Sequence, residues 1–209
     1  MPHEIDLAAL KISCQRGGRL VFRDLSFSLG PGQALLVTGP NGAGKTSLLR
    51  QIAGLLPLAA GDLRLDGAVA DAELPELCHY VGHLNAVKTS LSVAENLAFW
   101  AEFLGANAAR LAPALALDAF GLAPLADLPA GLLSAGQKRK LALSRLFTAK
   151  RPIWLLDEPQ TSLDATSLKL LDAAIASHLD GGGIAIVASH VALGTKFAKT
   201  LALGQERVS

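Results

Sequence analysis

The residues with the most specific chemistry lie between Gly39 and Thr46. They fit the pattern G-x-x-x-x-G-K-[ST] completely, which forms a phosphate-binding loop when a strand precedes it and a helix follows. Glycines let the backbone turn its N–H groups toward phosphate oxygens, and the start of a helix adds a positive dipole end. Lys45 would bridge the terminal phosphates, and the Thr46 hydroxyl would bind Mg²⁺. The residues expected to contact the nucleotide here are Gly39, Pro40, Asn41, Gly42, Ala43, Gly44, Lys45, Thr46 and Ser47.

Two acidic residues narrow the chemistry, because the loop motif alone is shared by kinases and GTPases. Asp157 and Glu158 end the apolar run Ile153–Leu156. Carboxylates at the C-terminal edge of such a strand face the same crevice as the phosphate loop. We predict that Asp157 holds Mg²⁺, directly or through water, and that Glu158 orients and polarises the attacking water. A second acid favours hydrolysis, since water needs a positioning group. Solvated acids at a strand end are the alternative.

A third segment, Leu133–Gln137, opens a predicted helix. The Ser134 hydroxyl and the N–H groups of Ala135 and Gly136 are therefore placed to meet an anion at a helix N-terminus. The run Lys138–Lys140 follows and puts cations where the helix dipole disfavours them. One interpretation is a solvated helix face. The other is added attraction for phosphates, or a polar contact with a partner.

The elements that must position these residues follow from the apolar pattern. Short apolar runs up to about Ser28, broken by Gly17-Gly18, predict antiparallel strands. The continuous apolar runs 34–38, 153–156 and 184–188 are typical of strands buried on both faces in a parallel sheet.

Helices are predicted between these strands. One runs from Lys45 to Ala53 and ends before Gly54. An Ala- and Leu-rich stretch from about 89 to 120 predicts a helical insertion, with breaks at the prolines 113, 124 and 129. Another helix is predicted over 137–149, with Leu141, Leu146 and Phe147 on one stripe.

The predicted fold class is thus α/β, with a P-loop NTPase core, an N-terminal antiparallel β subdomain and an inserted α-helical subdomain. We expect one domain over 1–209. Residues 1–83 would hold the β subdomain and the P-loop part of the core, 84–147 the helical subdomain, and 148–209 the rest of the core.

Composition sets the remaining limits. The chain has 209 residues, of which 51% are hydrophobic and 18% charged, which suits one globular domain, although length alone would also allow two small ones. A net charge of +1 gives no electrostatic footprint for nucleic acid. We expect no signal peptide, because the first residues are acidic rather than basic. Cys14 and Cys78 predict reduced thiols rather than a disulfide framework.

Five motifs occur in a fixed order along the chain. They are the phosphate loop, Leu133–Gln137, Asp157-Glu158-Pro159, Ser162-Leu163-Asp164 and His190. In this order the sequence resembles the nucleotide-binding domain of ABC ATPases over essentially its whole length. His190 alone would also be consistent with a core histidine.

The resemblance implies a head-to-tail dimer with two ATP molecules at the interface. Each ATP would touch the phosphate loop of one domain and Ser134, Ala135, Gly136 and Gln137 of the other. Asp164 would cross the interface, and His190 would contact the γ-phosphate. The catalytic residues expected from the motifs and the resemblance are Lys45, Glu158 and His190.

Two positions depart from the family pattern. Where ABC ATPases usually carry an aromatic residue that stacks on adenine, this sequence has Arg16, whose guanidinium can also stack on a base. Where a Gln usually follows the strand that holds Tyr80, this sequence has Gly82-His83. Imidazole is a poorer Mg²⁺ ligand than an amide oxygen. His83 is therefore expected to act on the metal through water or to serve a partner contact, with an exposed loop histidine as the alternative.

A narrower resemblance rests on the run His83, Lys88 and Glu95-Asn96-Leu97, together with Cys14–Arg16 and Leu20–Phe22. This run is similar to the ATP-binding subunits of the haem-export system of bacterial cytochrome c maturation. That resemblance implies ATP and Mg²⁺ as cofactors, a separate integral-membrane permease subunit, a second ATPase domain, and a peripheral position on the cytoplasmic face of the inner membrane. It implies that hydrolysis drives haem export or release of a haem-loaded chaperone.

Three alternatives stay open at this point. They are the ATPase of an ABC transporter for another substrate, a non-transport ABC protein acting on chromosomes or ribosomes, and a small-molecule P-loop kinase.

Overall fold

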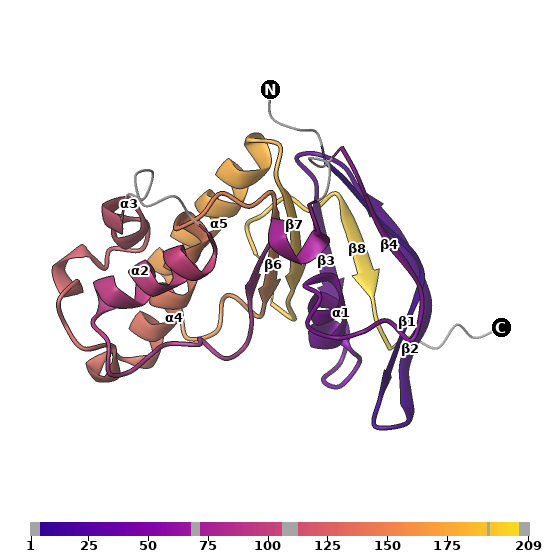
Figure 1. The fold of residues 1–209 in the computed structure, drawn as a ribbon, viewed down its shortest axis with the longest axis horizontal. Helices are drawn as coiled ribbons and strands as arrows, with labels where there is room; N and C mark the ends of the chain where they lie inside the picture. Colours follow the sequence, from indigo (N-terminus) through magenta and orange to yellow (C-terminus); the bar gives the residue numbers. More distant parts are fainter. Residues whose placement is uncertain (1–4, 68–71, 106–112, 192, 205–209) are drawn as a thin grey trace.

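The computed structural model describes residues 5–67, 72–105, 113–191 and 193–204. The chain begins with an antiparallel sheet of strand order β2-β1-β4, seen edge-on in Figure 1. Its strands are β1 (Asp6–Arg16), β2 (Arg19–Leu29) and β4 (Ala60–Asp66). The tight turn at Gly17-Gly18 joins β1 to β2, and both glycines have positive φ, as a two-residue hairpin turn of type I′ requires. The predicted antiparallel strands are therefore confirmed, whereas β4 was not predicted.

A five-stranded sheet of order β5-β6-β7-β3-β8 forms the centre of the molecule. All its strand pairs are parallel. The strands are β3 (Ala34–Thr38), β5 (Cys78–Val81), β6 (Ile153–Asp157), β7 (Ile184–Ala188) and β8 (Lys199–Ala202). Every residue of β6 and β7 is buried, because helices or the other sheet cover both faces. This is why their sequences are continuously apolar rather than alternating.

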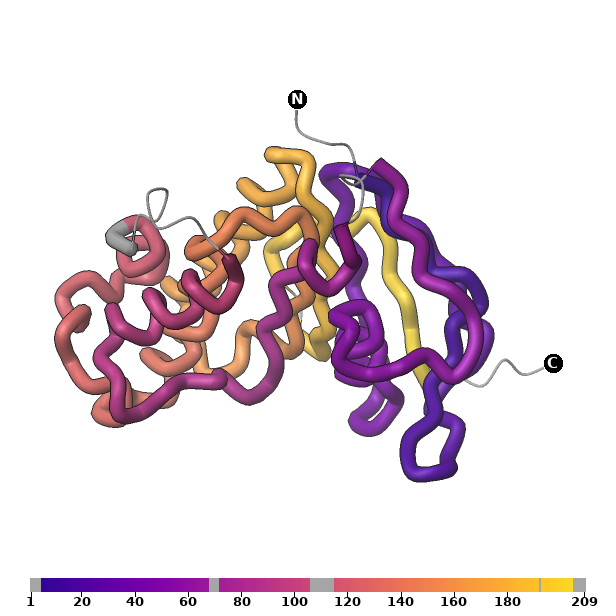
Figure 2. Tube along the Cα trace, viewed as in Figure 1, coloured from indigo at the N-terminus to yellow at the C-terminus, as the bar shows by residue number. Residues whose placement is uncertain are grey.

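Helices cover the central sheet and form a separate group beside it. α1 (Lys45–Ile52) lies between the two sheets, and its Leu48 and Leu49 are fully buried there. α4 (Ala135–Ser144) and α5 (Ala165–Asp180) pack on the opposite face of β6 and β7. Figure 2 shows that the chain leaves the sheet after β5, builds the helical group and returns through α4. That group contains α2 (Val93–Phe103) and α3 (Pro113–Asp118), with a small core of its own.

Four short 3₁₀ turns complete the described elements. They are η1 (Leu74–Leu77), η3 (Ala123–Leu125), η4 (Ala130–Leu132) and η5 (Arg145–Phe147). The helical insertion is confirmed, but Pro113 begins α3 instead of only breaking a helix, which suits a residue with a fixed φ and no N–H. The helix predicted over 137–149 starts two residues earlier and ends at Ser144. Phe147 falls in η5 and is 39% exposed, although its ring packs against the buried Phe120 and Trp154. The division at 83 and 147 stays a prediction.

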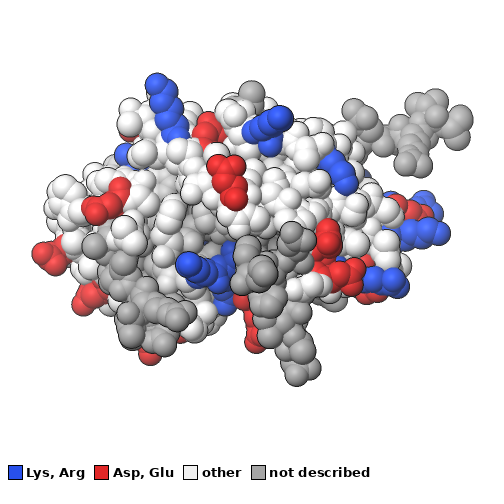
Figure 3. Space-filling view, turned by 90° about the horizontal axis from the view of Figure 1, so that it is seen from above, with Lys and Arg blue, Asp and Glu red and all other residues white. Residues whose placement is uncertain are grey.

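Three features of the structure relate to the predictions made from composition: the distribution of charge, the two cysteines and the lengths of the apolar helices. Figure 3 shows acidic and basic side chains interspersed over one face of the molecule. Cys14 and Cys78 are both free and buried. Within the part of the chain that the structure describes, no helix is both long enough and apolar enough to cross a membrane.

Candidate active site

The phosphate-loop segment connects β3 to α1, as the motif requires. Gly39 has a φ of 138° and Gly44 a φ of 103°, values that side chains disfavour. A side chain at Gly39 would collide with the Leu203 carbonyl, and one at Gly44 would come within 2.6 Å of the Val21 side chain. The two glycines therefore let the loop sit tightly between β2 and the end of β8. At its tip, Pro40, Asn41 and Gly42 are exposed.

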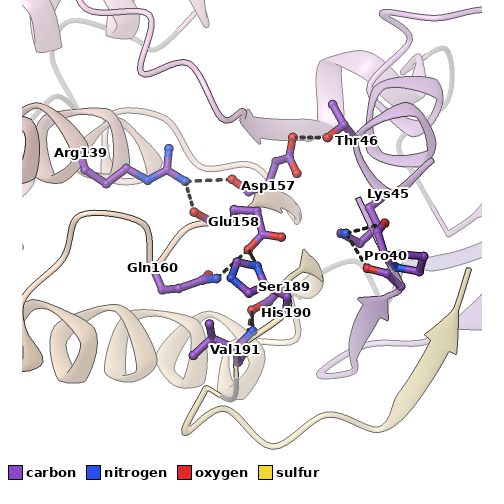
Figure 4. A network of polar contacts seen from close by, with 11 residues as sticks. Pro40, Lys45, Thr46, Arg139, Asp157, Glu158, Gln160, Ser189, His190 and Val191 are labelled. Atoms are coloured by element: carbon purple, nitrogen blue, oxygen red, sulfur yellow. Dashed lines mark hydrogen bonds and ion pairs between the residues drawn. The ribbon is translucent and has the colours of Figure 1, made fainter. Parts of the chain in front are cut away.

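The Lys45 side chain folds over this loop. It is 7% exposed, and its Nζ donates to the carbonyl oxygens of Gly39 at 2.7 Å and Pro40 at 3.2 Å. Figure 4 shows the ammonium group within the bend of the loop. A phosphate in the loop would offer it a charged acceptor, and charge-assisted hydrogen bonds are stronger than those to neutral carbonyls.

Thr46 and Asp157, the two predicted oxygen ligands of Mg²⁺, are brought together by the fold. The Thr46 hydroxyl donates to Asp157 Oδ2 at 2.8 Å across 111 positions of sequence. Asp157 ends β6 and is 1% exposed. Mg²⁺ is usually held by one or two carboxylates together with substrate phosphates and water, so a hydroxyl and a carboxylate fit. The described residues contain no group of three or more His, Cys, Asp or Glu side chains that would cage a metal alone.

His83 lies in the turn after β5 and is exposed. Among the described residues, no hydrogen bond joins its side chain to Thr46, Asp157 or Glu158. A role for His83 on the metal therefore stays a prediction that depends on water.

Glu158 follows Asp157 with an unusual backbone. Its φ of 47° lies in the left-handed region, which is costly for a residue with a side chain. Its Oε2 accepts a hydrogen bond from Gln160 Nε2 at 2.7 Å and lies 2.8 Å from His190 Nδ1. The Glu158 side chain is 14% exposed and that of His190 is 64% exposed. Figure 4 shows these three side chains converging beside the end of β6. The carboxylate is thus held by two neighbours at the edge of solvent.

The segment 133–137 forms the start of α4 rather than a contact with the phosphate loop of its own chain. Ser134 is the N-cap: its Oγ accepts from Gln137 N at 3.2 Å, and Gln137 Oε1 accepts from Ser134 N at 2.8 Å. This capping box occupies the Gln137 side chain. The Ser134 hydroxyl hydrogen stays available, because Oγ only accepts in this pair. Ser134 and Ala135 are exposed, so a second molecule can reach them.

The loop before α5 packs against this segment. A Cβ at Gly136 would meet the Ser162 carbonyl oxygen at 2.8 Å, so a glycine is needed there. Asp164 caps α5 by accepting from Ser167 N at 2.7 Å and Ser167 Oγ at 2.6 Å. Its other oxygen lies 3.7 Å from Lys140 Nζ. Hydrogen bonds from Ser167, and next to them the Lys140 charge, hold the pKa of Asp164 below its usual value.

Arg16 ends β1 opposite Arg19 and is exposed. A hollow of about 770 Å³ beside the phosphate loop is lined by residues 20–25 of β2 and residues 201–204 at the end of β8. Stacking of Arg16 on a base stays a prediction.

The interpretation of Lys138–Lys140 as a solvated or phosphate-attracting run was wrong for its central residue. Arg139 is 2% exposed and donates to backbone carbonyls beneath the acidic residues. A sequence pattern existed for this: Arg139 lies four positions before Leu143 and seven before Leu146, both buried, so helical periodicity puts it on the inner face. Gln160 was also missed, and nothing in its sequence context points to Glu158.

Comparison with known proteins places this geometry in a family. A family model described as "ABC transporter" matches residues 22–161. The chain belongs to the ABC transporter family. This membership agrees with the five ordered motifs and excludes the small-molecule kinase interpretation.

Relatives and solved structures extend the match over the chain. A protein of Bradyrhizobium diazoefficiens named cytochrome c biogenesis ATP-binding export protein CcmA is 52% identical over 190 residues, covering 91% of this chain and 94% of that protein. The protein of the same name from Rhizobium meliloti is 50% identical and covers 93% and 96%. The structure of a putative ABC transporter ATP-binding protein from Pyrococcus furiosus has a TM-score of 0.80 and 22% identity, covering 95% and 97%. The predicted ABC ATPase fold is confirmed.

Proposed function

We propose that this chain is the ATP-hydrolysing subunit of a membrane ABC transporter that exports haem or releases a haem-loaded chaperone in cytochrome c biogenesis. The relatives named CcmA, about half identical over nearly the whole chain, support the haem system over another substrate. One structural observation carries the catalytic part. Thr46, Asp157, Glu158 and His190 come from three separate segments and meet at the carboxyl edge of one parallel sheet.

The proposed mechanism gives each of these side chains a role. The backbone of residues 39–44 and the Lys45 ammonium bind the phosphates of ATP. Thr46 and Asp157 would hold Mg²⁺, which would neutralise charge on the phosphates. Glu158 orients the attacking water, and His190 stabilises negative charge on the transferring phosphoryl group.

The site is proposed to work in pairs. Ser134 and Ala135 are exposed at the start of α4, and this exposure supports a head-to-tail dimer in which Ser134 and the N–H groups of Ala135 and Gly136 complete the partner copy's site. Asp164 is held next to this segment by Lys140 and would cross the same interface.

The membrane partner is proposed to be a separate permease of the CcmB type on the inner membrane of a bacterium. The turn that holds His83 would pass closure of the pair to that subunit. Both proposals rest on the resemblance and on the exposure of this turn.

Replacing Glu158 by Gln tests the core of the proposal. The amide keeps the size and one acceptor oxygen but loses the charge that polarises water, so hydrolysis is expected to fall at least about 100-fold. ATP binding should persist and leave an ATP-bound dimer, detectable as a doubled mass by light scattering. Full turnover of MgATP by Glu158→Gln would overturn the assignment of Glu158.

A further inference from the structure

The Arg139 guanidinium is saturated with hydrogen bonds although it is buried. Its Nε donates to the Pro159 carbonyl at 3.1 Å, and its Nη2 donates to the carbonyls of Asp157 and Glu158, both at 2.9 Å. Its Nη1 donates to the Gly82 carbonyl at 2.8 Å and to Asn85 Oδ1 at 3.2 Å. A guanidinium has five N–H groups, so each one has an acceptor. A buried polar group whose hydrogen bonds are all satisfied fixes the groups around it, so Arg139 is expected to hold these five acceptors in place.

The three consecutive carbonyls explain the strained backbone of Glu158. In an extended strand, successive carbonyls point to opposite sides, so they cannot all reach one cation. The left-handed φ of 47° at Glu158 breaks this alternation and lets residues 157–159 turn their oxygens toward Arg139. The Glu158 side chain then points the other way, toward Gln160 and His190 (Figure 4). The cation thus compensates a conformation that would otherwise cost free energy.

The charge on Arg139 persists under cellular conditions. Burial lowers the pKa of Arg139 to about 10, while the nearby carboxylates of Asp157 and Glu158 act in the opposite direction. The group is therefore protonated at neutral pH and contributes a full positive charge beneath the two acids.

The same guanidinium also joins two other parts of the site. Gly82 and Asn85 flank His83 in the turn after β5, and Arg139 itself lies in the first turns of α4, two residues after Gln137. A displacement of α4 or of the turn would therefore shift the backbone of Glu158, because the Arg139 side chain is hydrogen-bonded to the turn and to that backbone.

We propose that Arg139 is a positioning residue for ATP hydrolysis, holding the Glu158 carboxylate in register with the attacking water and linking it to α4 and to the His83 turn. This inference rests on the proposed function, in which Glu158 orients that water. Arg139 itself has no contact with the reacting atoms, since its five donors are all engaged.

The test compares the buried Arg139 with the half-buried Arg151 in the full chain with MgATP. Arg139→Lys keeps a charge but has three donors on one nitrogen, which cannot meet five spread acceptors. Arg151→Lys is the matched control: Arg151 also donates to three carbonyls, those of Pro75, Cys78 and Leu104, but it lies near the amino ends of β5 and β6, whereas the acids lie at the carboxyl end of β6. Thermal unfolding and the steady-state KM for ATP and kcat are measured for both variants. If Arg139→Lys does not fold, Arg139→Gln, which keeps two donors, replaces it.

We expect Arg139→Lys to lower kcat about tenfold or more, the scale of a misplaced catalytic group, with KM changed by no more than about twofold. Arg151→Lys should also lower the unfolding temperature but keep kcat. In a Glu158→Gln background, Arg139→Lys should cause little further loss, because a residue that acts through Glu158 has nothing left to position.

The outcomes that contradict the role of Arg139 differ from those that contradict the proposed function. A kcat of Arg139→Lys near that of the parent, an equal fall in Arg151→Lys, or a full additional loss in the Glu158→Gln background would each make Arg139 a structural residue only. Those results leave the proposed function intact if Glu158→Gln alone is slow. Rapid turnover by Glu158→Gln would instead overturn the proposed function and this inference with it.

Discussion

His79 provides a prediction whose size follows from the structure. The imidazole is 1% exposed in β5, and its Nε2 lies 2.8 Å from the Ala149 carbonyl oxygen. Burial lowers the pKa of His79 from 6.5 to about 4, and the positive charges of Arg151 and Arg145 act in the same direction. In the folded protein the ring is therefore neutral at pH 7, with its Nε2–H donating to Ala149.

Acid should destabilise the fold through this group. Because the folded pKa is the lower one, the unfolded chain takes up the proton first as the pH falls. The contribution of His79 is complete above about pH 6.5 and is lost toward about pH 4. Between pH 7 and pH 5 the loss in the free energy of unfolding is about 2 kcal/mol, a large part of the usual margin of about 5–15 kcal/mol.

Urea unfolding at pH 7 and pH 5 measures this loss. His79→Gln keeps an N–H donor for Ala149 but does not titrate, so its stability should fall about 2 kcal/mol less than that of the parent over this range. Other titrating groups are common to both proteins and cancel in the comparison. His83→Gln, at an exposed position, is the control and should behave as the parent does. Parallel losses in the parent and His79→Gln would refute the reasoning.

Two further predictions concern the nucleotide site. Thr46→Val removes the hydroxyl that faces Asp157 and should lower MgATP hydrolysis about 100-fold while ATP binding without Mg²⁺ persists; equal Mg²⁺ dependence in both proteins would contradict the metal role. Gly136→Ala places a Cβ at 2.8 Å from the Ser162 carbonyl oxygen, so it should shift the loop before α5. The expected results are a loss of about 1–3 kcal/mol in the free energy of unfolding and a lower rate of dimer-dependent hydrolysis. Ala135→Gly, at the exposed neighbouring position, adds no Cβ and should cause neither the shift of this loop nor the loss of dimer-dependent hydrolysis. If Gly136→Ala keeps the stability and hydrolysis of the parent, the loop before α5 accommodates the added Cβ and the reasoning is wrong.

The parts of the fold that are visible in the sequence are those whose residues carry a strong local pattern. β3, β6 and β7 are continuously apolar because both of their faces are covered. β4 and β8 were missed because they are short edge strands with mostly exposed residues. Only Leu63 and Leu65 of β4 and Leu201 of β8 are partly buried, so the apolar pattern is too short to identify a strand. The end of α4 was misplaced because the 3₁₀ turn that follows keeps a helical sequence.

The sequence by itself predicted which residues would bind phosphate, metal and water, because the spacing of the phosphate loop and the acids after a buried strand admit few geometries. Only the tertiary structure decided how those residues are held. The Thr46–Asp157 contact spans 111 positions, and the neighbours of Glu158 come from the end of β7 and from its own following turn. Arg139 lies in a run of three cations in the sequence, yet in the fold it is buried against β6 and donates hydrogen bonds to five acceptors. Local pattern specifies the chemistry of each group, whereas the convergence of distant carbonyls on one charge depends on how the elements pack.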